Sequence, residues 1–188
     1  GMLKHGVLGL LSYGDMTGYE IMEVFRDSLA FFWNASTSQI YRELQGLERK
    51  GFASSRIEEQ EGRPNRRVYS LTEAGREELS RWLSPTEADV RGDVQIRFPF
   101  LLRLFFMAEA QASEQEAYVQ VLIALSERFV TAMEDVPEII GAYGSHEGNA
   151  GKSVFWMMTA DFGIRYARML HEWSQACRDQ LDTLQEGK

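Results

Sequence analysis

The apolar and polar positions of this chain repeat most regularly between residues 36 and 51. The apolar side chains recur there at helical spacing, at Ile40, Leu44 and Leu47. Ser36 and Gln39 come first, with the S-x-x-Q spacing of a capping box, in which two side chains accept hydrogen bonds from backbone N–H groups. Gly51 follows the last turn, where a glycine commonly ends a helix. We therefore predict an amphipathic helix that turns its apolar stripe toward a core.

A hairpin is predicted directly after this helix. Residues 52–59 and 66–71 have the composition of β-strands, and the sequence Gly62-Arg63-Pro64-Asn65 between them is typical of a turn. The tip is basic, because it carries Arg63, Arg66 and Arg67. A helix that can enter a major groove, followed by a ribbon that reaches the neighbouring backbone, is the arrangement of a winged helix-turn-helix.

Residues 1–84 are predicted to complete this domain. An apolar helix over about residues 3–11 comes first. Thr17 and Glu20 form a second capping box, which opens a helix with inward positions at Ile21, Met22, Phe25 and Leu29. We expect the next aromatic side chains to pack in a turn or in the core rather than to bind a ligand; they are Phe31, Phe32 and Trp33. Thr72 is expected to cap a further helix that carries Ala74, Leu79, Trp82 and Leu83.

Residues 85–188 are predicted to form a second, helical domain after a hinge at residues 84–86. An apolar segment spans about residues 93–112, with Pro99 in its first turn or at a break. Ser113 and Glu116 form a third capping box before a long helix with apolar positions at Tyr118, Val121, Leu122, Leu125, Phe129 and Met133. We expect this helix to stop near Pro137, followed by a loop over residues 141–151 and a last helix over residues 152–184.

The last predicted helix carries two repeats with heptad spacing. One repeat is Phe155, Phe162, Met169 and Ala176, and the other is Thr159, Tyr166, Trp173 and Gln180. Such a seam packs against another helix, either within the same chain or in a second copy. Because a single winged helix reads few base pairs, we favour a dimer contact through Phe155, Phe162, Tyr166, Met169 and Trp173.

The net charge of −8 is distributed unevenly along the chain. Residues 1–84 hold 11 Lys and Arg against 12 Asp and Glu, whereas residues 85–188 hold 9 against 16. Residues 36–67 hold 7 against 5 and are therefore positive. The acidic excess lies outside the predicted helix and hairpin, and the local charge governs contact with phosphates.

The polar stripe of this helix and the hairpin tip carry side chains that can bond to base edges or phosphates. The predicted DNA contacts are Ser36, Thr37, Ser38, Gln39, Tyr41, Arg42, Gln45, Arg49, Arg63, Asn65, Arg66 and Arg67. For the helix alone, the alternative is an ordinary solvated face. For the hairpin, the alternative is a loop whose arginines pair with Glu58, Glu59 and Glu61. The order and separation of helix and hairpin favour DNA.

Composition argues against several other classes of protein. A hydrophobic content of 44% in 188 residues is enough for a substantial core. No stretch approaches the roughly 20 apolar residues that span a membrane, and no secretory signal is present, so a cytoplasmic location is expected. The single cysteine, Cys177, excludes an internal disulfide framework and a cysteine-rich zinc site.

Enzyme signatures are missing from the sequence as well. It lacks a Gly-rich phosphate loop, an H-E-x-x-H motif and a G-x-S-x-G motif. The three histidines, His5, His146 and His171, are far apart in unrelated contexts. We therefore expect no enzymatic activity, no cofactor and no metal.

The first half of the chain carries a series of short motifs: Gly18-Tyr19-Glu20, Trp33, Ile40-Tyr41, Leu44, Leu47, Gly51, Gly62-Arg63-Pro64 and Arg67-x-Tyr69-x-Leu71-Thr72-x-x-Gly75. Through these motifs, the first half resembles the PadR family of transcriptional regulators. The motifs cover roughly residues 3–83 in family order. The second half is similar to the larger members of the virulence-activator type, through an aromatic run over residues 98–106 and two long helices.

The resemblance implies a mainly α-helical protein: a winged-helix domain with a small β-hairpin wing, and a C-terminal helical dimerisation domain. It also implies a dimeric repressor that binds double-stranded DNA at a pseudo-palindromic operator and that a small hydrophobic or phenolic effector relieves. Candidate effector contacts are Trp82, Phe105, Trp156, Met158, Phe162 and Tyr166, with an ordinary core as the alternative. The alternative function is a protein-interaction module that does not bind DNA selectively.

Overall fold

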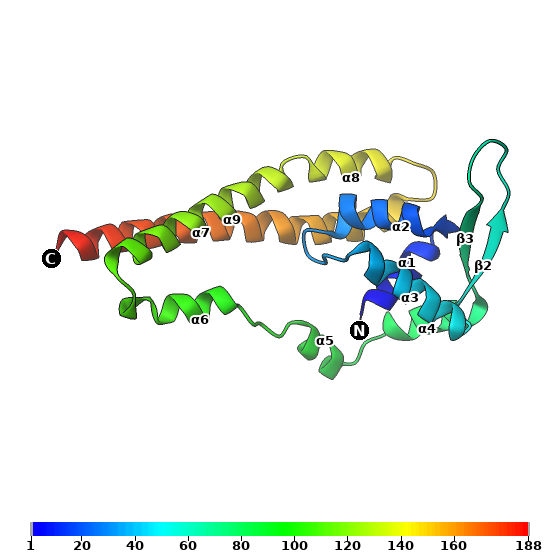
Figure 1. Ribbon diagram of the computed structural model, residues 1–188, viewed down its shortest axis with the longest axis horizontal. Coiled ribbons are helices and arrows are strands. Elements are labelled where there is room, and N and C mark those ends of the chain that lie inside the picture. Colours follow the sequence, from blue (N-terminus) through cyan, green and yellow to red (C-terminus); the bar gives the residue numbers. More distant parts are fainter. Residues whose placement is uncertain (1, 188) are drawn as a thin grey trace. The chain divides into compact units, whose positions relative to one another are not determined.

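We describe residues 2–187 in a computed structural model of the protein. The chain forms two compact units that divide between Ile96 and Arg97. The division lies after the hinge predicted at residues 84–86, because one more short helix belongs to the first unit. Both units are mainly helical, as predicted, and the described strands all lie in the first (Figure 1).

The first unit contains a winged helix-turn-helix. Its elements are α1 (Leu3–Leu11), β1 (Met16–Thr17), α2 (Gly18–Val24), the π-helical turn η1 (Phe25–Leu29), α3 (Thr37–Arg49), β2 (Ala53–Glu58), β3 (Arg66–Leu71), α4 (Glu73–Trp82) and α5 (Glu87–Asp93). The three strands form an antiparallel sheet in the order β1-β3-β2. Figure 1 shows β2 and β3 extending as a hairpin beyond the helices.

One apolar core holds the helices and the base of the hairpin together. It is built from buried side chains of α1, α2, η1, α3 and the sheet, among them Val7, Leu8, Ile21, Phe25, Ile40, Leu44, Leu47 and Tyr69. The predicted apolar stripe of α3 is therefore confirmed. Gly75 lies at a close contact between α4 and the hairpin, because a Cβ there would be 2.1 Å from the carbonyl oxygen of Phe52.

Two features of the first unit differ from what the sequence pattern indicated. Of the two alternatives for the aromatic side chains, Phe32 and Trp33 lie in the turn rather than in the core and are 49% and 39% exposed, since the loop after η1 carries them to the surface. Thr86 and Asp89 form a capping box that opens α5, which the sequence pattern did not indicate because this helix buries no side chain.

The second unit is an antiparallel pair of long helices with shorter ones attached. Its elements are α6 (Pro99–Phe105), the 3-10 turn η2 (Met107–Glu109), α7 (Ala112–Met133), α8 (Val136–Gly144) and α9 (Ala150–Glu186). Helix α9 packs along α7 and, near its start, along α8 (Figure 1). Pro99 lies in the first turn of α6, as one of the two predicted alternatives had it.

Small and polar side chains form much of the buried seam between α7 and α9. Ser126, Ala160, Gly163, Ala167 and Ser174 are all buried there. The Ser126 hydroxyl lies 3.1 Å from the Ser174 hydroxyl and 3.2 Å from Nδ1 of His171. Side chains this small let the two helix backbones approach closely, while these hydrogen bonds satisfy the buried polar groups.

Several boundaries predicted for the second unit are wrong. Helix α7 begins after Gln111, whose backbone N–H donates to Glu114 over 3.0 Å, so the predicted capping box at Ser113 and Glu116 does not form. The reason is Gln115, which is buried and donates to the carbonyls of Met107 and Ala110, fixing the helix start. Val121 and Leu125 face outward because Val119, Leu122 and Ser126 take the inward positions.

The long helix does stop near Pro137, since α7 ends at Met133, but a further helix, α8, occupies part of the predicted loop. Pro137 lies in the first turn of α8. Proline is tolerated at this position because the backbone N–H that it lacks would have no hydrogen-bond partner within the helix. Residues 141–144, predicted as loop, belong to α8, and α9 already begins at Ala150. The loop between these helices is therefore short.

Candidate nucleic-acid interface

Local hydrogen bonds fix both ends of α3. The Ser36 N–H donates to Oε1 of Gln39 over 2.8 Å, and the Gln39 N–H donates to Oγ of Ser36 over 3.2 Å. At the other end Gly51 adopts a φ of +75°. There the N–H groups of Phe52 and Gly51 donate to the carbonyls of Leu47 and Glu48, closing the helix with a Schellman motif. The predicted capping box is confirmed.

The side chains of Ser36 and Gln39 are consequently committed to the helix start. Both were predicted as DNA contacts, but their oxygen atoms accept hydrogen bonds from each other's backbone. The Ser36 hydroxyl also lies 3.1 Å from that of Ser38. In this structure these two side chains therefore hold the N-terminus of α3 in place and satisfy two of the backbone N–H groups that lack a partner within the helix.

The rest of the predicted stripe on α3 is exposed on one side of the helix. It comprises Thr37, Ser38, Tyr41, Arg42, Gln45 and Arg49. Within residues 2–187, neither Arg42 nor Arg49 makes an ion pair. Two uncompensated guanidiniums on an otherwise neutral polar face suit an anionic partner.

The hairpin tip presents a third free guanidinium. Glu58 pairs with Arg66 at the last position of the sheet register, and the chain reverses through Gly62, which has a φ of +69°. Asn65 steadies this turn by accepting a hydrogen bond from the Gln60 N–H over 3.4 Å. Arg63 is exposed and, among the described residues, has no carboxylate within ion-pair distance.

The other two hairpin arginines are already engaged by acidic side chains. Arg66 contacts Glu58 over 2.9 Å and Glu20 over 3.3 Å. Arg67 lies 3.3 Å from the Ser55 hydroxyl and 3.9 Å from the Glu48 carboxylate of α3. The Arg66 guanidinium holds the pKa of Glu58 below its usual value. The alternative of internal pairing is thus correct for Arg66 through Glu58, whereas Glu59 and Glu61 take no part in an ion pair among residues 2–187.

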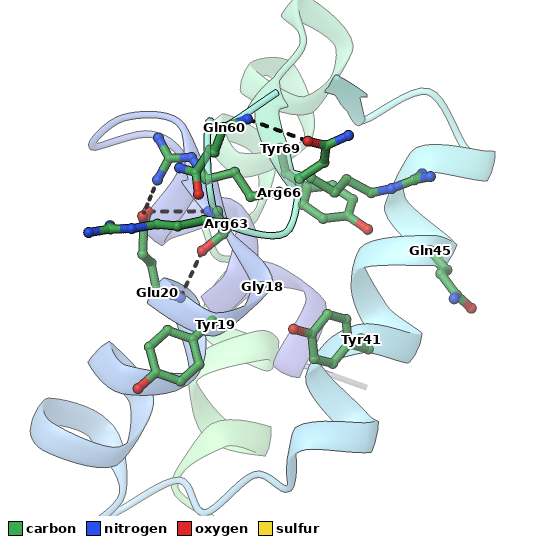
Figure 2. Close-up of a pocket in the computed structure, with 12 residues that line it drawn as sticks. Gly18, Tyr19, Glu20, Tyr41, Gln45, Gln60, Arg63, Arg66 and Tyr69 are labelled. Atoms are coloured by element: carbon green, nitrogen blue, oxygen red, sulfur yellow. Dashed lines mark hydrogen bonds and ion pairs between the residues drawn. The ribbon is translucent and has the colours of Figure 1, made fainter. Parts of the chain in front are cut away.

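A cavity of about 780 Å³ lies between the start of α2, α3 and the hairpin. Its lining includes side chains from all three, such as Tyr19, Tyr41, Gln45, Arg63, Arg67 and Tyr69. Figure 2 shows the rings of Tyr19 and Tyr41 on either side of Gly18. Tyr41 lies directly against this glycine, since a Cβ on Gly18 would be 2.5 Å from Cε1 of the ring. The groove therefore combines hydroxyl and amide groups with cationic side chains.

Sequence reasoning missed part of this groove. Tyr19 and Tyr69 were not predicted as site residues, although Gly18-Tyr19-Glu20 was among the motifs that carried the family resemblance. Tyr69 is 4% exposed, and burial raises the pKa of its hydroxyl. No periodicity separates these tyrosines from ordinary core aromatics, so only the fold brings them to the groove.

The predicted dimer residues divide into two sets. Phe155, Phe162 and Met169 are exposed on α9, with Phe162 at 68%. Tyr166 and Trp173 are half-buried inside the second unit. The ring of Tyr166 lies 5.8 Å from that of Phe129, and the ring of Trp173 lies 5.8 Å from that of Phe100. The outer set forms an apolar stripe, and the inner set is largely internal packing.

The candidate effector residues are not gathered into one site within either unit. Trp82 belongs to the first unit, where it stacks on His5 with ring centroids 4.9 Å apart. The other five belong to the second unit, where Phe162 and Tyr166 stack at 6.2 Å. Phe105 is 81% exposed, Met158 is exposed and Trp156 is half-buried. None of the six lines the groove beside α3.

In the part of the chain that the structure describes, no group of three or more His, Cys, Asp or Glu side chains is placed to hold a metal ion. Nor does any helix there have the length and apolar character needed to cross a membrane.

The two halves of the chain match two different family descriptions. Residues 7–81 match the Transcriptional regulator PadR-like family, and residues 96–182 match the family described as Virulence activator alpha C-term. The Negative transcriptional regulator PadR of Bacillus subtilis is 36% identical over 119 residues, which cover 62% of this chain and 61% of that protein. The match therefore spans less than two thirds of that relative's length.

Solved structures with this fold cover nearly the whole chain. The Vibrio cholerae virulence activator AphA has a TM-score of 0.72 at 26% identity, covering 97% of this chain and 99% of that one. Bacillus subtilis PadR in complex with operator DNA has a TM-score of 0.76 at 23% identity, covering 96% and 99%. The same Bacillus protein has also been solved in complex with p-coumaric acid. At these identities the Bacillus structures establish the fold.

Proposed function

We infer the function of this chain from its two family matches, to the PadR-like family over residues 7–81 and to the virulence-activator C-terminal family over residues 96–182. We propose that it is a sequence-specific DNA-binding transcriptional regulator that acts as a homodimer and represses from a pseudo-palindromic operator. The proposal does not include an enzymatic activity, and it places the protein with the DNA in the cytoplasm.

One observation supports this function more than any other. Among the described residues, Arg42 and Arg49 on the exposed face of α3 form no ion pair, and neither does Arg63 on the hairpin across the groove. In a winged helix, the second helix of the motif enters the major groove and the wing reaches the adjacent backbone. Free guanidiniums on both elements suit this arrangement, because arginine binds guanine edges and phosphates.

The residues then take different roles in the proposed complex. Arg42 and Gln45, at the centre of the exposed stripe, would contact base edges together with Ser38, while Thr37 and Arg49 would contact the flanking backbone. The Tyr41 hydroxyl would donate to a phosphate from the groove. Arg63, Asn65 and Arg67 would hold the wing on the DNA. These contacts give one copy only a short site, so a dimer on two half-sites would supply the affinity.

The dimer would form through the second unit. Phe155, Phe162 and Met169 form an exposed apolar stripe on the longest helix of the chain.

The Bacillus regulator has been solved with p-coumaric acid, and we propose that a small hydrophobic or phenolic molecule relieves repression here too. Because its candidate contacts are not gathered into one site within either unit, this effector site would be completed only in the assembled protein.

The decisive test is selection of bound sequences from a random pool of duplex DNA. The wild-type protein is expected to enrich a pseudo-palindrome, and Arg42→Ala is expected to lose or relax the enrichment. Arg76→Ala is the matched control, because Arg76 is equally exposed but lies on α4, outside the groove. If the folded wild-type protein enriches no sequence at low salt, the alternative of a protein-interaction module is correct instead.

A further inference from the structure

We propose that Arg66 is a positioning residue that fixes the angle of the wing, and that it does not contact DNA. This inference rests on the proposed function, and it changes the role that sequence reasoning gave to one of the three wing arginines. The remaining two keep their roles as phosphate contacts, with Arg63 as the principal one.

Arg66 belongs to a continuous chain of ion pairs that runs from Asp15 to Glu20. Asp15, just before β1, contacts Arg56 over 2.8 Å. Arg56 contacts one oxygen of Glu58 over 3.1 Å, and Arg66 contacts the other over 2.9 Å. Arg66 then reaches Glu20 on α2 over 3.3 Å. Each guanidinium is thus held between two carboxylates that come from different elements.

The chain of ion pairs joins the hairpin to the body of the domain. Glu20 uses one oxygen for Arg66 and the other to accept from the Thr17 N–H over 3.2 Å, so it is fixed by the capping box of α2. Asp15 precedes the strand that pairs with β3. The ends of the network are therefore anchored in β1 and α2, and its centre lies on the hairpin.

The outer part of the hairpin needs such support. β1 pairs with β3 only at Tyr69 and Val68, whereas the β2–β3 ladder continues outward to Glu58 and Arg66. Beyond Val68 the wing is a two-stranded ribbon, and isolated two-stranded ribbons are marginally stable in water. Arg66 bridges from this unsupported part to α2, directly next to the tip that carries Arg63.

The local charge also opposes a phosphate at Arg66. The network contains three carboxylates and two guanidiniums, so its net charge is negative even with both arginines present. The Arg56 guanidinium likewise lowers the pKa of Asp15, which keeps that carboxyl ionised. A phosphate near Arg66 would meet Glu58 and Glu20, whereas Arg63 has no carboxylate within ion-pair distance among the described residues.

Neutralising Glu58 distinguishes positioning from direct contact, because the two roles predict opposite signs. If Arg66 positions the wing, Glu58→Gln lowers operator affinity, as Arg66→Ala does, by about two- to fivefold for exposed ion pairs. The double variant then loses no more than either single variant. If Arg66 binds phosphate and Glu58 competes for it, Glu58→Gln raises the affinity.

The experiment is a titration of selected operator DNA at several salt concentrations, with the full-length variants. Arg63→Ala should make the slope of log affinity against log salt shallower by about one, the signature of one lost phosphate contact. Arg66→Ala should leave this slope unchanged. Glu20→Gln provides a further variant, because glutamine keeps the capping box while it removes the carboxylate charge.

Two results would overturn the inference: a shallower slope for Arg66→Ala equal to that of Arg63→Ala, or tighter binding by Glu58→Gln. Thermal unfolding of each variant separates a loosened wing from an unfolded domain, and Glu58→Gln decides the question even if Arg66→Ala fails to fold. Failure of the proposed function is distinguishable, since it appears in the wild-type protein as a lack of selective binding.

Discussion

Gly18→Ala is expected to weaken DNA binding without destabilising the protein. Gly18 is buried at the start of α2, and the ring of Tyr41 rests against it (Figure 2). A Cβ at this position would lie 2.5 Å from Cε1, 2.8 Å from Cζ and 3.0 Å from the hydroxyl oxygen of Tyr41. The added methyl group therefore competes for space with Tyr41, a side chain of α3 that lines the groove.

The size of the effect follows from these distances. Carbon atoms in contact are about 3.5–4.0 Å apart, so the ring must retreat by about 1 Å. Tyr41 is 40% exposed and can move toward solvent, which makes the shift cheap for the free protein. In the proposed complex, however, the displaced hydroxyl loses a hydrogen bond to a phosphate. Such bonds to charged groups contribute about 1.5–3 kcal/mol, which corresponds to roughly a 10- to 100-fold loss of affinity.

The assay is titration of operator DNA with Gly18→Ala, Tyr41→Phe and the double variant, together with thermal unfolding of each. Both single variants should weaken binding to a similar extent, and the double variant should be no weaker than Tyr41→Phe alone. The melting temperature of Gly18→Ala should be unchanged or higher, because alanine is favoured over glycine in helices by up to about 1 kcal/mol. Unchanged affinity in Gly18→Ala, or a loss that adds fully to that of Tyr41→Phe, would refute the reasoning.

Three further predictions concern stability and assembly. Gly75→Ala should lower the free energy of unfolding by about 1–3 kcal/mol in urea titrations, because its Cβ would meet the Phe52 carbonyl at 2.1 Å. Hydrogen bonds from Arg81 and His5 lower the pKa of Glu78 to about 2. This carboxylate therefore stabilises the fold above pH 4.5 and loses that effect as the pH falls toward 2, so urea titrations of Glu78→Gln should show a weaker dependence on pH in that interval. Phe162→Glu should convert dimer to monomer in sedimentation equilibrium with unchanged helicity, since Phe162 is 68% exposed, whereas the control Gln175→Glu should remain dimeric.

The DNA-binding half of the fold was predictable because its signals are local. The capping boxes at Thr17 and Ser36 and the cap at Thr72 are side-chain-to-backbone bonds that span three residues, so sequence spacing alone specifies them. Gly51 ends α3 with a positive φ for an equally local reason. These signals fix where helices begin and end, and the apolar stripe of α3 then fixes which face is exposed.

Whether each arginine forms an ion pair within the chain was not predictable from local sequence signals. Arg63, Arg66 and Arg67 are the same type of residue and lie within the same short stretch of the sequence. Glu58 lies opposite Arg66 because of the register of the hairpin. The approach of α2 brings Glu20 to the same guanidinium, and Glu48 of α3 lies near Arg67. Which charges remain available for DNA therefore depends on pairings between elements far apart in the sequence, where no local pattern applies.

The second half of the chain illustrates why a heptad of large apolar residues does not reveal its own partner. The face of α9 that packs on α7 is made of small side chains, with Ala160, Gly163, Ala167 and Ser174 buried. A seam of this kind closes tightly and has no room for phenylalanine, so Phe155, Phe162 and Met169 remain on the outside. These three residues therefore do not pack in the seam between α7 and α9. An exposed apolar stripe along so long a helix is what a monomer avoids and what an interface between subunits uses. One face of α9 carries small side chains that pack on α7, and another carries large apolar side chains that are exposed. This difference is the physical reason to place the proposed dimer contact on α9.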